Sequence, residues 1–183
     1  MHNNIFGTDG IRGKVGHEPI ISSSLIKIGY CFAKEMFSDR SGIIVIGHDG
    51  RESSDMIIKN LSIGILAQGS KFIYAGIIPT ASLAIYLNSK SISTMAGIQI
   101  TASHNIYKDN GMKFFDHHGK KISQINEKSI NNQYHNVENI DNRKINNLQI
   151  DSSIKKTYIE FIKKYISNKL PILNKSKKTL SLI

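Results

Sequence analysis

Ser103 is the residue of this chain whose neighbours most clearly suggest chemistry. It lies in the stretch TASHN (101–105), directly after an apolar run and a few residues before an Asn-Gly pair. A hydroxyl beside an imidazole and an amide, in a loop that follows a strand, is placed where a substrate can reach it. The plainer interpretation of the same serine is a polar cap in a surface loop.

The letters around Ser103 argue against several familiar catalytic sites. A serine-hydrolase elbow needs Gly-x-Ser-x-Gly, whereas Ser103 lies in Ala-Ser-His. His104 is the adjacent residue, and adjacent side chains rarely reach the geometry of a nucleophile and its base. Neither a Walker loop nor a dinucleotide-binding glycine motif occurs, and the seven histidines show no paired ligand spacing. A hydrolase, an NTPase, a dehydrogenase and a zinc site are therefore poor fits.

Phosphoryl transfer through Ser103 remains. A phosphoserine carries about two negative charges, so its pocket needs cations and hydrogen-bond donors rather than a triad. An arginine offers a planar fork that suits phosphate oxygens. The Asp-Asn-Gly stretch at 109–111 is expected to turn and fold Lys113 back toward the serine. The candidate phosphate-binding side chains are Arg12, Arg51, His104, Asn105 and Lys113.

Alternating apolar segments predict an α/β domain that positions these residues. Strands are expected at 42–49, 71–76 and 95–100, and helices at 22–38, 53–68 and about 79–87, with a helix cap among residues 22–24 and Gly69 ending the second helix. This alternation is typical of a largely parallel sheet sandwiched by helices, whose ligands collect at the carboxyl ends of the strands. Residues 112–122 are expected to add a hairpin of two short strands.

The rest of the chain predicts a second, incomplete unit. Residues 126–147 are polar and Asn-rich, which indicates a frayed helix and a linker. A helix begins near Asp151 with an apolar side and a lysine-rich side. Residues 178–183 resemble the opening strand of another sheet. We expect a first domain at 1–140, a linker at 141–150 and the truncated start of a second α/β domain at 151–183.

The composition restricts the partners of this chain. The net charge is +10, but residues 143–183 carry ten Lys or Arg against two acids, so the basic excess belongs mainly to the tail. The tail shows no aromatic platform of the kind that nucleic-acid binding uses, so a nucleic-acid partner is not expected. No apolar run reaches the length of a membrane span, no secretory signal is present, and a single cysteine suits a reducing cytosol. We expect a cytoplasmic protein without a membrane partner.

Three motifs in register resemble the α-D-phosphohexomutase family. They are FGTDGIRG (6–13), GHDGR (47–51) and TASHNIYKDNGMKFF (101–115), and the likeness continues more weakly through YIEF (158–161). The first motif and DNGMKFF favour the bacterial glucosamine-phosphate branch over the glucose and mannose branches. The likeness covers well under half of the length usual for the family.

The resemblance implies both an activity and a set of site residues. Ser103 would be phosphorylated and would exchange its phosphate with a hexosamine phosphate, interconverting glucosamine 6-phosphate and glucosamine 1-phosphate. Mg²⁺ would bridge the phosphoserine, so Ser103 is the implied metal contact through its phosphate. Arg12 and Lys113 match positions that contact phosphate or assist proton transfer, and His104 and Asn105 complete the loop.

The chain also departs from the family pattern. Ile106 stands where the family usually has proline, which removes a constraint on the loop. No two aspartates lie two residues apart, so the family's Asp-x-Asp-x-Asp metal loop is missing, as are its sugar-reading and distal phosphate loops. We expect little or no activity from this chain alone, and a separate chain could supply the missing domains. The alternatives are a non-catalytic remnant and a mutase for another hexose phosphate.

Overall fold

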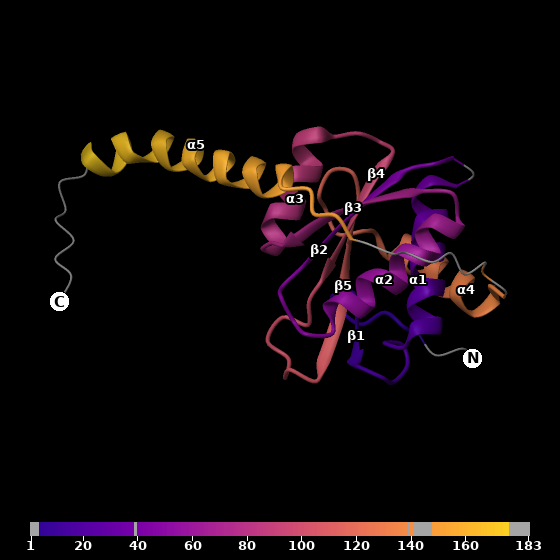
Figure 1. Cartoon of the computed structure of the whole chain (residues 1–183). Coiled ribbons are helices and arrows are strands. Elements are labelled where there is room, and N and C mark those ends of the chain that lie inside the picture. The colour runs from indigo at the N-terminus through magenta and orange to yellow at the C-terminus, as the bar shows by residue number, and fades with distance from the viewer. Residues whose placement is uncertain (1–3, 39, 139, 141–147, 176–183) are drawn as a thin grey trace.

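A mixed sheet with helices on both faces forms the body of this protein (Figure 1). The computed structural model describes residues 4–38, 40–138, 140 and 148–175. The elements are β1 (Ile11–Lys14), α1 (Ser22–Phe37), β2 (Ile43–His48), α2 (Ser54–Ala67), β3 (Lys71–Ile77), α3 (Thr80–Lys90), β4 (Met95–Ile100), β5 (Asp109–Phe115), α4 (Gln124–Asn136) and α5 (Ser153–Lys175). The predicted α/β class and the alternation of strands and helices are confirmed.

The sheet has five strands in the order β1-β5-β4-β2-β3. Strand β2 pairs in parallel with both β3 and β4, as the continuous apolar run predicts for a strand covered on both faces. Strand β5 runs antiparallel to β1 on one side and to β4 on the other. The carboxyl ends of β2 and β4 therefore lie next to each other, and the segments after them meet at one edge of the sheet.

Each face of the sheet has its own core, because successive strand residues point in opposite directions. Ile44 and Ile46 pack with the apolar sides of α1, α2 and α4. Val45, which lies between them, packs with Leu83 and Leu87 of α3 on the other face. Figure 1 shows these helices on either side of the strands. The predicted sandwich of a sheet between helices is therefore confirmed.

Two helix ends differ in how well the sequence predicted them. The predicted serine cap of α1 is wrong, because the N-cap is Ile21 and no side chain caps the first turn. Gly69 does follow α2, with a positive φ of 97° and its N–H 3.0 Å from the Leu66 carbonyl oxygen. A glycine takes this conformation at little steric cost, which is why it ends the helix.

The predicted Asp-Asn-Gly turn and the predicted hairpin are both corrected. Residues 109–111 are the first residues of β5, where they pair with 12–14 of β1. The Asn110 side chain donates to the Ser53 hydroxyl at 2.9 Å, so it is held inside the fold rather than in a turn. After β5 the chain reverses at Asp116, and the returning segment forms an isolated bridge from Phe115 to Lys121 and a hydrogen bond from the Ile122 N–H to the Phe114 carbonyl oxygen at 3.2 Å, but it is no second strand.

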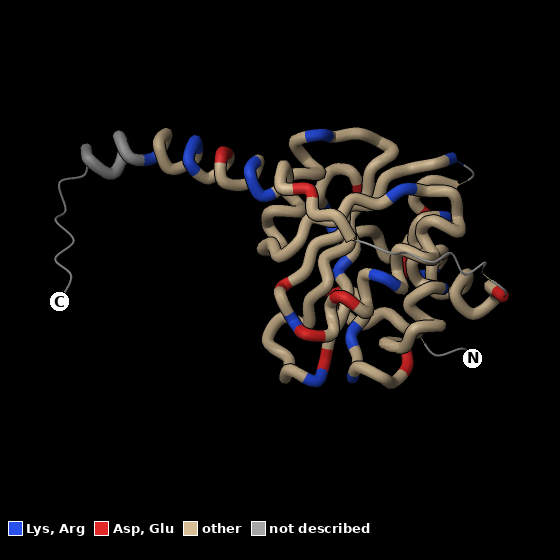
Figure 2. Tube along the Cα trace, in the orientation of Figure 1, with Lys and Arg blue, Asp and Glu red and all other residues tan. Residues whose placement is uncertain are grey.

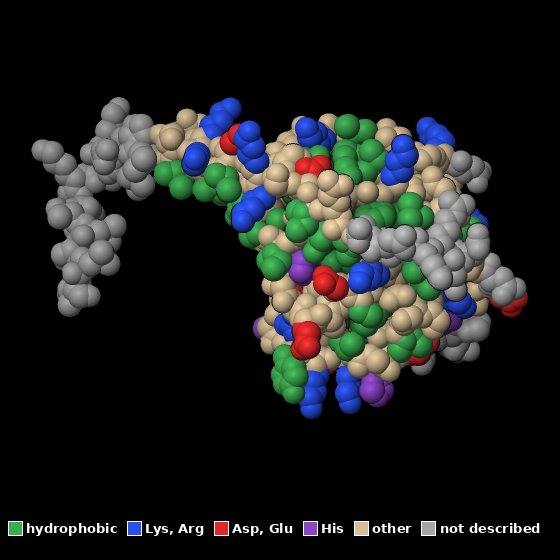
Figure 3. Space-filling model, viewed as in Figure 1, with side chains coloured by type: hydrophobic (Ala, Val, Ile, Leu, Met, Phe, Trp, Pro, Cys, Tyr) green, Lys and Arg blue, Asp and Glu red, His purple; other side chains and the backbone are tan. Residues whose placement is uncertain are grey.

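Helix α5 projects away from the body, beyond α3 (Figure 1). Its buried Ile154 joins the core that contains α3. Farther along, Phe161 and Tyr165 are 47% and 55% exposed, and Figure 3 shows hydrophobic side chains along one side of this helix. Figure 2 shows mainly basic residues on the same helix, whereas both signs of charge intersperse over the body. The predicted amphipathic helix is confirmed.

Several predictions fall on residues that the structure leaves undescribed. The expected strand at 178–183 and most of the linker at 141–150 lie outside the described ranges. Of the linker, Ile150 forms a bridge with Tyr74 of β3, and the Asp151 N–H donates to the Tyr74 carbonyl oxygen at 2.7 Å. Within the described ranges, no helix combines the length and hydrophobicity needed to cross a bilayer.

Candidate active site

The serine loop, residues 101–108, starts where β4 ends. The Ser103 N–H donates to the Thr101 hydroxyl at 2.9 Å, and the Asn105 N–H donates to the Ala102 carbonyl oxygen at 3.0 Å. Ser103 has a φ of 57°, in the left-handed region that non-glycine residues rarely occupy. The residue is exposed, and no hydrogen bond among the described residues uses its hydroxyl. The loop therefore presents this hydroxyl to solvent.

A tight turn at Gly7–Gly10 brings a carboxylate to the same edge. The Gly7 N–H donates to the Gly10 carbonyl oxygen at 2.8 Å, which closes the turn around Asp9. A carboxylate oxygen of Asp9 lies 2.6 Å from Lys113 Nζ and 3.5 Å from an Arg12 guanidinium nitrogen. The hydrogen bond from Lys113, together with the charges of Lys113 and Arg12, holds the pKa of Asp9 below its usual value despite the opposing effect of burial. The carboxylate thus gathers the two cations predicted for the site.

The sheet register explains why Arg12 and Lys113 share a face. Arg12 on β1 is paired with Gly111 on β5. Lys113 is two residues beyond Gly111, so its side chain points to the same face as that position. Cross-strand neighbours offset in this way lie within reach of long side chains. Lys113 is therefore placed by strand pairing rather than by the turn predicted from the sequence.

Asn105 links these cations to the serine loop. Its side-chain oxygen accepts a hydrogen bond from an Arg12 guanidinium nitrogen at 3.3 Å. Its amide nitrogen donates to the Asp109 carboxylate at 3.0 Å. Arg12, Asn105 and Lys113, three of the predicted site residues, thus belong to one connected group that is joined to the serine loop through Asn105. His104 is exposed, and among the described residues it makes no hydrogen bond or ion pair.

Arg51 reaches the serine loop from the segment that follows β2. Its guanidinium group donates to the backbone carbonyl oxygens of Ser103, Asn105, Ile106 and Asp109, at 2.8–3.0 Å. Its Nε donates to the Asp49 carboxylate at 3.2 Å. A guanidinium group has five N–H donors, and all are used on protein acceptors here. Phosphate binding by Arg51 stays a prediction, and in this structure Arg51 holds the loop.

The sequence did not predict which side chains hold the segment that carries Arg51. The buried His48 ring accepts the Gly50 N–H at its Nδ1 (3.3 Å), which leaves the proton on Nε2 to donate to the Tyr74 hydroxyl at 2.9 Å. Burial lowers the pKa of His48, while the charges of Asp55 and Asp49 oppose that shift. Thr101 was also missed, although a threonine two residues before the serine is a local signal for such a turn. Nothing local to Tyr74 marks its contact with His48.

The described residues do not by themselves form a magnesium site. No group of three His, Cys, Asp or Glu side chains within the described part of the chain lies close enough to hold a metal ion. Mg²⁺ takes octahedral oxygen ligands, usually with carboxylates among them. Near Ser103, the Asp9 carboxylate is paired with Lys113 and the Asp109 carboxylate accepts from Asn105. These residues do not fit the ion.

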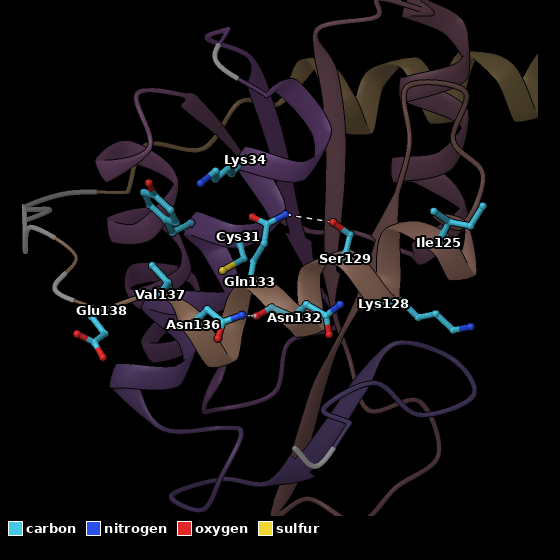
Figure 4. Close-up of a pocket in the computed structure, with 11 residues that line it drawn as sticks. Cys31, Lys34, Ile125, Lys128, Ser129, Asn132, Gln133, Asn136, Val137 and Glu138 are labelled. Atoms are coloured by element: carbon cyan, nitrogen blue, oxygen red, sulfur yellow. Dashed lines mark hydrogen bonds between the residues drawn. The ribbon is translucent and has the colours of Figure 1, made fainter. Parts of the chain in front are cut away.

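A hollow of about 680 Å³ between α1 and α4 contains none of the predicted site residues (Figure 4). Ser129 and Gln133 of α4, which line it, donate to the carboxylate of Glu35 on α1 at 2.5 and 2.9 Å. The Cys31 thiol on its wall is buried. These polar side chains join two helices, so the hollow is a feature of helix packing.

Known protein sequences include a family and several relatives that this chain is similar to. Residues 3–141 match the family described as "Phosphoglucomutase/phosphomannomutase, alpha/beta/alpha domain I". A phosphoglucosamine mutase of Hamiltonella defensa is 42% identical over 132 residues, which are 72% of this chain and 29% of that protein. The phosphoglucosamine mutase of Thiobacillus denitrificans is 33% identical over 180 residues, 94% of this chain and 39% of that protein. The chain thus spans less than two fifths of the length of these relatives.

Solved structures give the same result for the fold. A putative phosphomannomutase from Thermus thermophilus superimposes with a TM-score of 0.73 at 27% identity, covering 90% of this chain and 37% of that one. A phosphoglucomutase/phosphomannomutase family protein from Burkholderia thailandensis has a TM-score of 0.63 at 24% identity, covering 73% of this chain and 30% of that one. The second likeness concerns the fold alone.

Proposed function

Because this chain belongs to the phosphoglucomutase/phosphomannomutase family, we propose that Ser103 accepts a phosphate and exchanges it with a phosphorylated hexosamine. The observation that carries the proposal is an exposed serine hydroxyl on a loop that is tied to Thr101 and Arg51 through the Ser103 backbone and to Arg12 through Asn105. We propose glucosamine 6-phosphate and glucosamine 1-phosphate as substrates, because the relatives named above are phosphoglucosamine mutases.

The neighbouring side chains suit that transfer. A phosphate on Ser103 would bring about two negative charges to a loop whose Asn105 is hydrogen-bonded to Arg12, and Arg12 shares the Asp9 carboxylate with Lys113. Asp9 holds both cations at one point and thereby limits their motion. We propose that Arg12 contacts phosphate oxygens and that Lys113 assists proton transfer at the sugar oxygen. His104 and Asn105 would contact the ligand from the loop itself.

The complete reaction needs more groups than the described residues offer. We propose that metal ligands and sugar contacts come from a separate chain, and that the 183-residue polypeptide alone turns over little substrate. The absence of any Asp-x-Asp pair from the sequence supports this proposal. Without groups that close over the sugar, water can also compete for the phosphate. We propose a cytoplasmic location for the reaction.

Phosphate incorporation tests the assignment directly. Purified chain is incubated with glucosamine 1,6-bisphosphate or glucose 1,6-bisphosphate and Mg²⁺, and the modified residue is located by peptide mass spectrometry. We expect phosphate on Ser103, and none after Ser103→Ala. Ser41→Ala, at an exposed serine elsewhere, is the matched control and should label normally.

The outcomes of this experiment separate the alternatives. Labelling that survives Ser103→Ala would refute Ser103 as the acceptor, and no labelling of the wild-type chain would favour a non-catalytic remnant. Faster labelling by glucose or mannose bisphosphate would assign the chain to another hexose phosphate. A coupled assay for glucosamine 1-phosphate that gave normal turnover by the purified polypeptide would contradict the proposed need for further groups.

A further inference from the structure

Both backbone groups of Ser103 are tied to other residues. Its N–H donates to the Thr101 hydroxyl at 2.9 Å, and its carbonyl oxygen accepts from Arg51 Nη2 at 3.0 Å. The same Nη2 donates to the Asn105 carbonyl oxygen at 2.9 Å. The φ of 57° at Ser103 is costly for a non-glycine residue and persists only where surrounding contacts hold it. These contacts fix the direction in which the Ser103 side chain leaves the backbone.

The other half of the guanidinium group holds the far end of the loop. Arg51 Nη1 donates to the carbonyl oxygens of Ile106, at 2.8 Å, and Asp109, at 3.0 Å. Arg51 thus spans the loop from its catalytic residue to the first residue of β5. Hydrogen bonds from a charged donor are roughly twice as strong as neutral ones. Four of them on one side chain make Arg51 the main tertiary support of this loop.

Arg51 is itself held in place from β2. The Asp49 carboxylate accepts the Arg51 backbone N–H at 3.2 Å and the side-chain Nε at 3.2 Å, which orients the guanidinium plane. His48 anchors the intervening Gly50 through the N–H contact described above. The Arg51 side chain is only 16% exposed, so its position is set by packing as well as by hydrogen bonds. A lysine could not reproduce the four contacts, because an ammonium group has only three donors.

We propose that Arg51 is a positioning residue for the Ser103 hydroxyl, which it aims at the incoming phosphoryl group by clamping the loop carbonyls. This inference rests on the proposed function. In the step it serves, a bond forms between Ser103 Oγ and phosphorus, and the bond between phosphorus and the sugar oxygen breaks. The hydroxyl proton ends on that sugar oxygen. Arg51 touches neither reacting atom, because all five of its N–H groups are used on protein acceptors.

Hydrogen exchange of the full chain measures the clamp without any reaction. In Arg51→Ala, we expect the hydrogen-bonded amides of the loop, those of Ser103, Asn105 and Asp109, to exchange about 10- to 100-fold faster, the range expected from losing one or two charged hydrogen bonds at a given peptide. Amides of β2, β3 and β4 should be unchanged. Arg51→Lys should give an intermediate result and covers the case in which the alanine variant does not fold. Arg40→Ala, at an exposed arginine after α1, is the matched control and should match wild type.

Labelling kinetics then measure the consequence for Ser103. With glucosamine 1,6-bisphosphate as the donor, the rate constant at saturation should fall about 10- to 100-fold in Arg51→Ala, because small misplacements of a reacting group have effects of this size. The half-saturating donor concentration should change less than about threefold, since Arg51 has no N–H left for a ligand. Added guanidinium ion should restore part of the rate to Arg51→Ala and none to Ser103→Ala.

The two proposals can fail separately. Unchanged exchange of the Ser103, Asn105 and Asp109 amides, or a labelling rate within about twofold of wild type in Arg51→Ala, would overturn the positioning role. A large rise in half-saturating concentration with an unchanged rate constant would overturn it as well, and would return Arg51 to phosphate binding. A wild-type chain that takes up no phosphate would instead refute the proposed function, while the exchange experiment would still decide whether Arg51 holds the loop.

Discussion

Replacing Gly10 by alanine should separate Asp9 from Lys113 without changing either side chain. Gly10 has a φ of +89°, and a Cβ built there would overlap the Met112 carbonyl oxygen and lie 3.3 Å from Lys113 Cα. The turn at Gly7–Gly10 can therefore lie against β5 only while Gly10 has no side chain. That close approach is what puts the Asp9 carboxylate 2.6 Å from Lys113 Nζ.

The size of the effect follows from two costs. An alanine in the left-handed region costs about 1–2 kcal/mol, and forcing an atom into a filled space costs about 1–3 kcal/mol. We expect Gly10→Ala to lower the free energy of unfolding by about 2–5 kcal/mol in total. Gly16 is the matched control: its φ is +85°, and a Cβ there would meet nothing within 4 Å. Gly16→Ala should therefore show only the first cost.

Urea denaturation of the two variants measures this difference, and titration of the Asp9 carboxyl by NMR reports on the site. In Gly10→Ala, the pKa of Asp9 should rise toward its ordinary value, because the hydrogen bond and charge of Lys113 now lower it. In Gly16→Ala it should stay low. Equal losses of stability in the two variants, or an unchanged pKa of Asp9 in Gly10→Ala, would refute the claim that this close approach assembles the ion pair.

Two further predictions concern buried titratable groups. Burial lowers the pKa of His48. This imidazole is therefore protonated less readily in the folded state than in the unfolded chain, where it takes up a proton below about pH 6.5. The free energy of unfolding should therefore be highest above that pH and should fall by up to about 1.4 kcal/mol per pH unit as the pH drops toward the lower pKa of His48 in the folded state. Urea midpoints between pH 7 and 5 measure this loss. His48→Asn should show a smaller dependence on pH over the same window. Burial raises the pKa of the Cys31 thiol to about 12, so the folded chain should react with iodoacetamide at pH 8 far more slowly than the urea-unfolded chain. Equal alkylation rates in the two states would contradict the burial of this thiol.

Local patterns predicted most of the elements. The runs Ile43–His48 and Met95–Ile100 are continuous and apolar because each strand is covered on both faces, and that pattern is visible in the sequence alone. The spacing of Ile57, Leu61 and Ile65 likewise predicted α2, whose apolar side faces the core. The position of Ser103 in an exposed loop after a strand could also be predicted, because it depends only on its neighbours in the chain.

Residues 109–111 show where local reasoning fails. Asp-Asn-Gly favours a turn, but these residues pair with β1, and on their other side the Thr101 N–H donates to the Gly111 carbonyl oxygen at 3.0 Å. The contact from Asn110 to Ser53 spans 57 residues of sequence. Local preference amounts to about 1 kcal/mol, so the sum of such tertiary contacts overrides it.

The sequence by itself thus determined the class of fold, the exposed serine and the types of side chain available around it. Only the tertiary structure decided that Asp9 forms ion pairs with both Lys113 and Arg12 and that Arg51 donates hydrogen bonds to the loop carbonyl oxygens. The physical reason is that periodicity and turn preference act over a few residues, whereas these contacts join segments up to about a hundred residues apart. Such contacts depend on the order of strands in the sheet, β1-β5-β4-β2-β3, which brings the ends of β2 and β4 and the start of β1 to one edge.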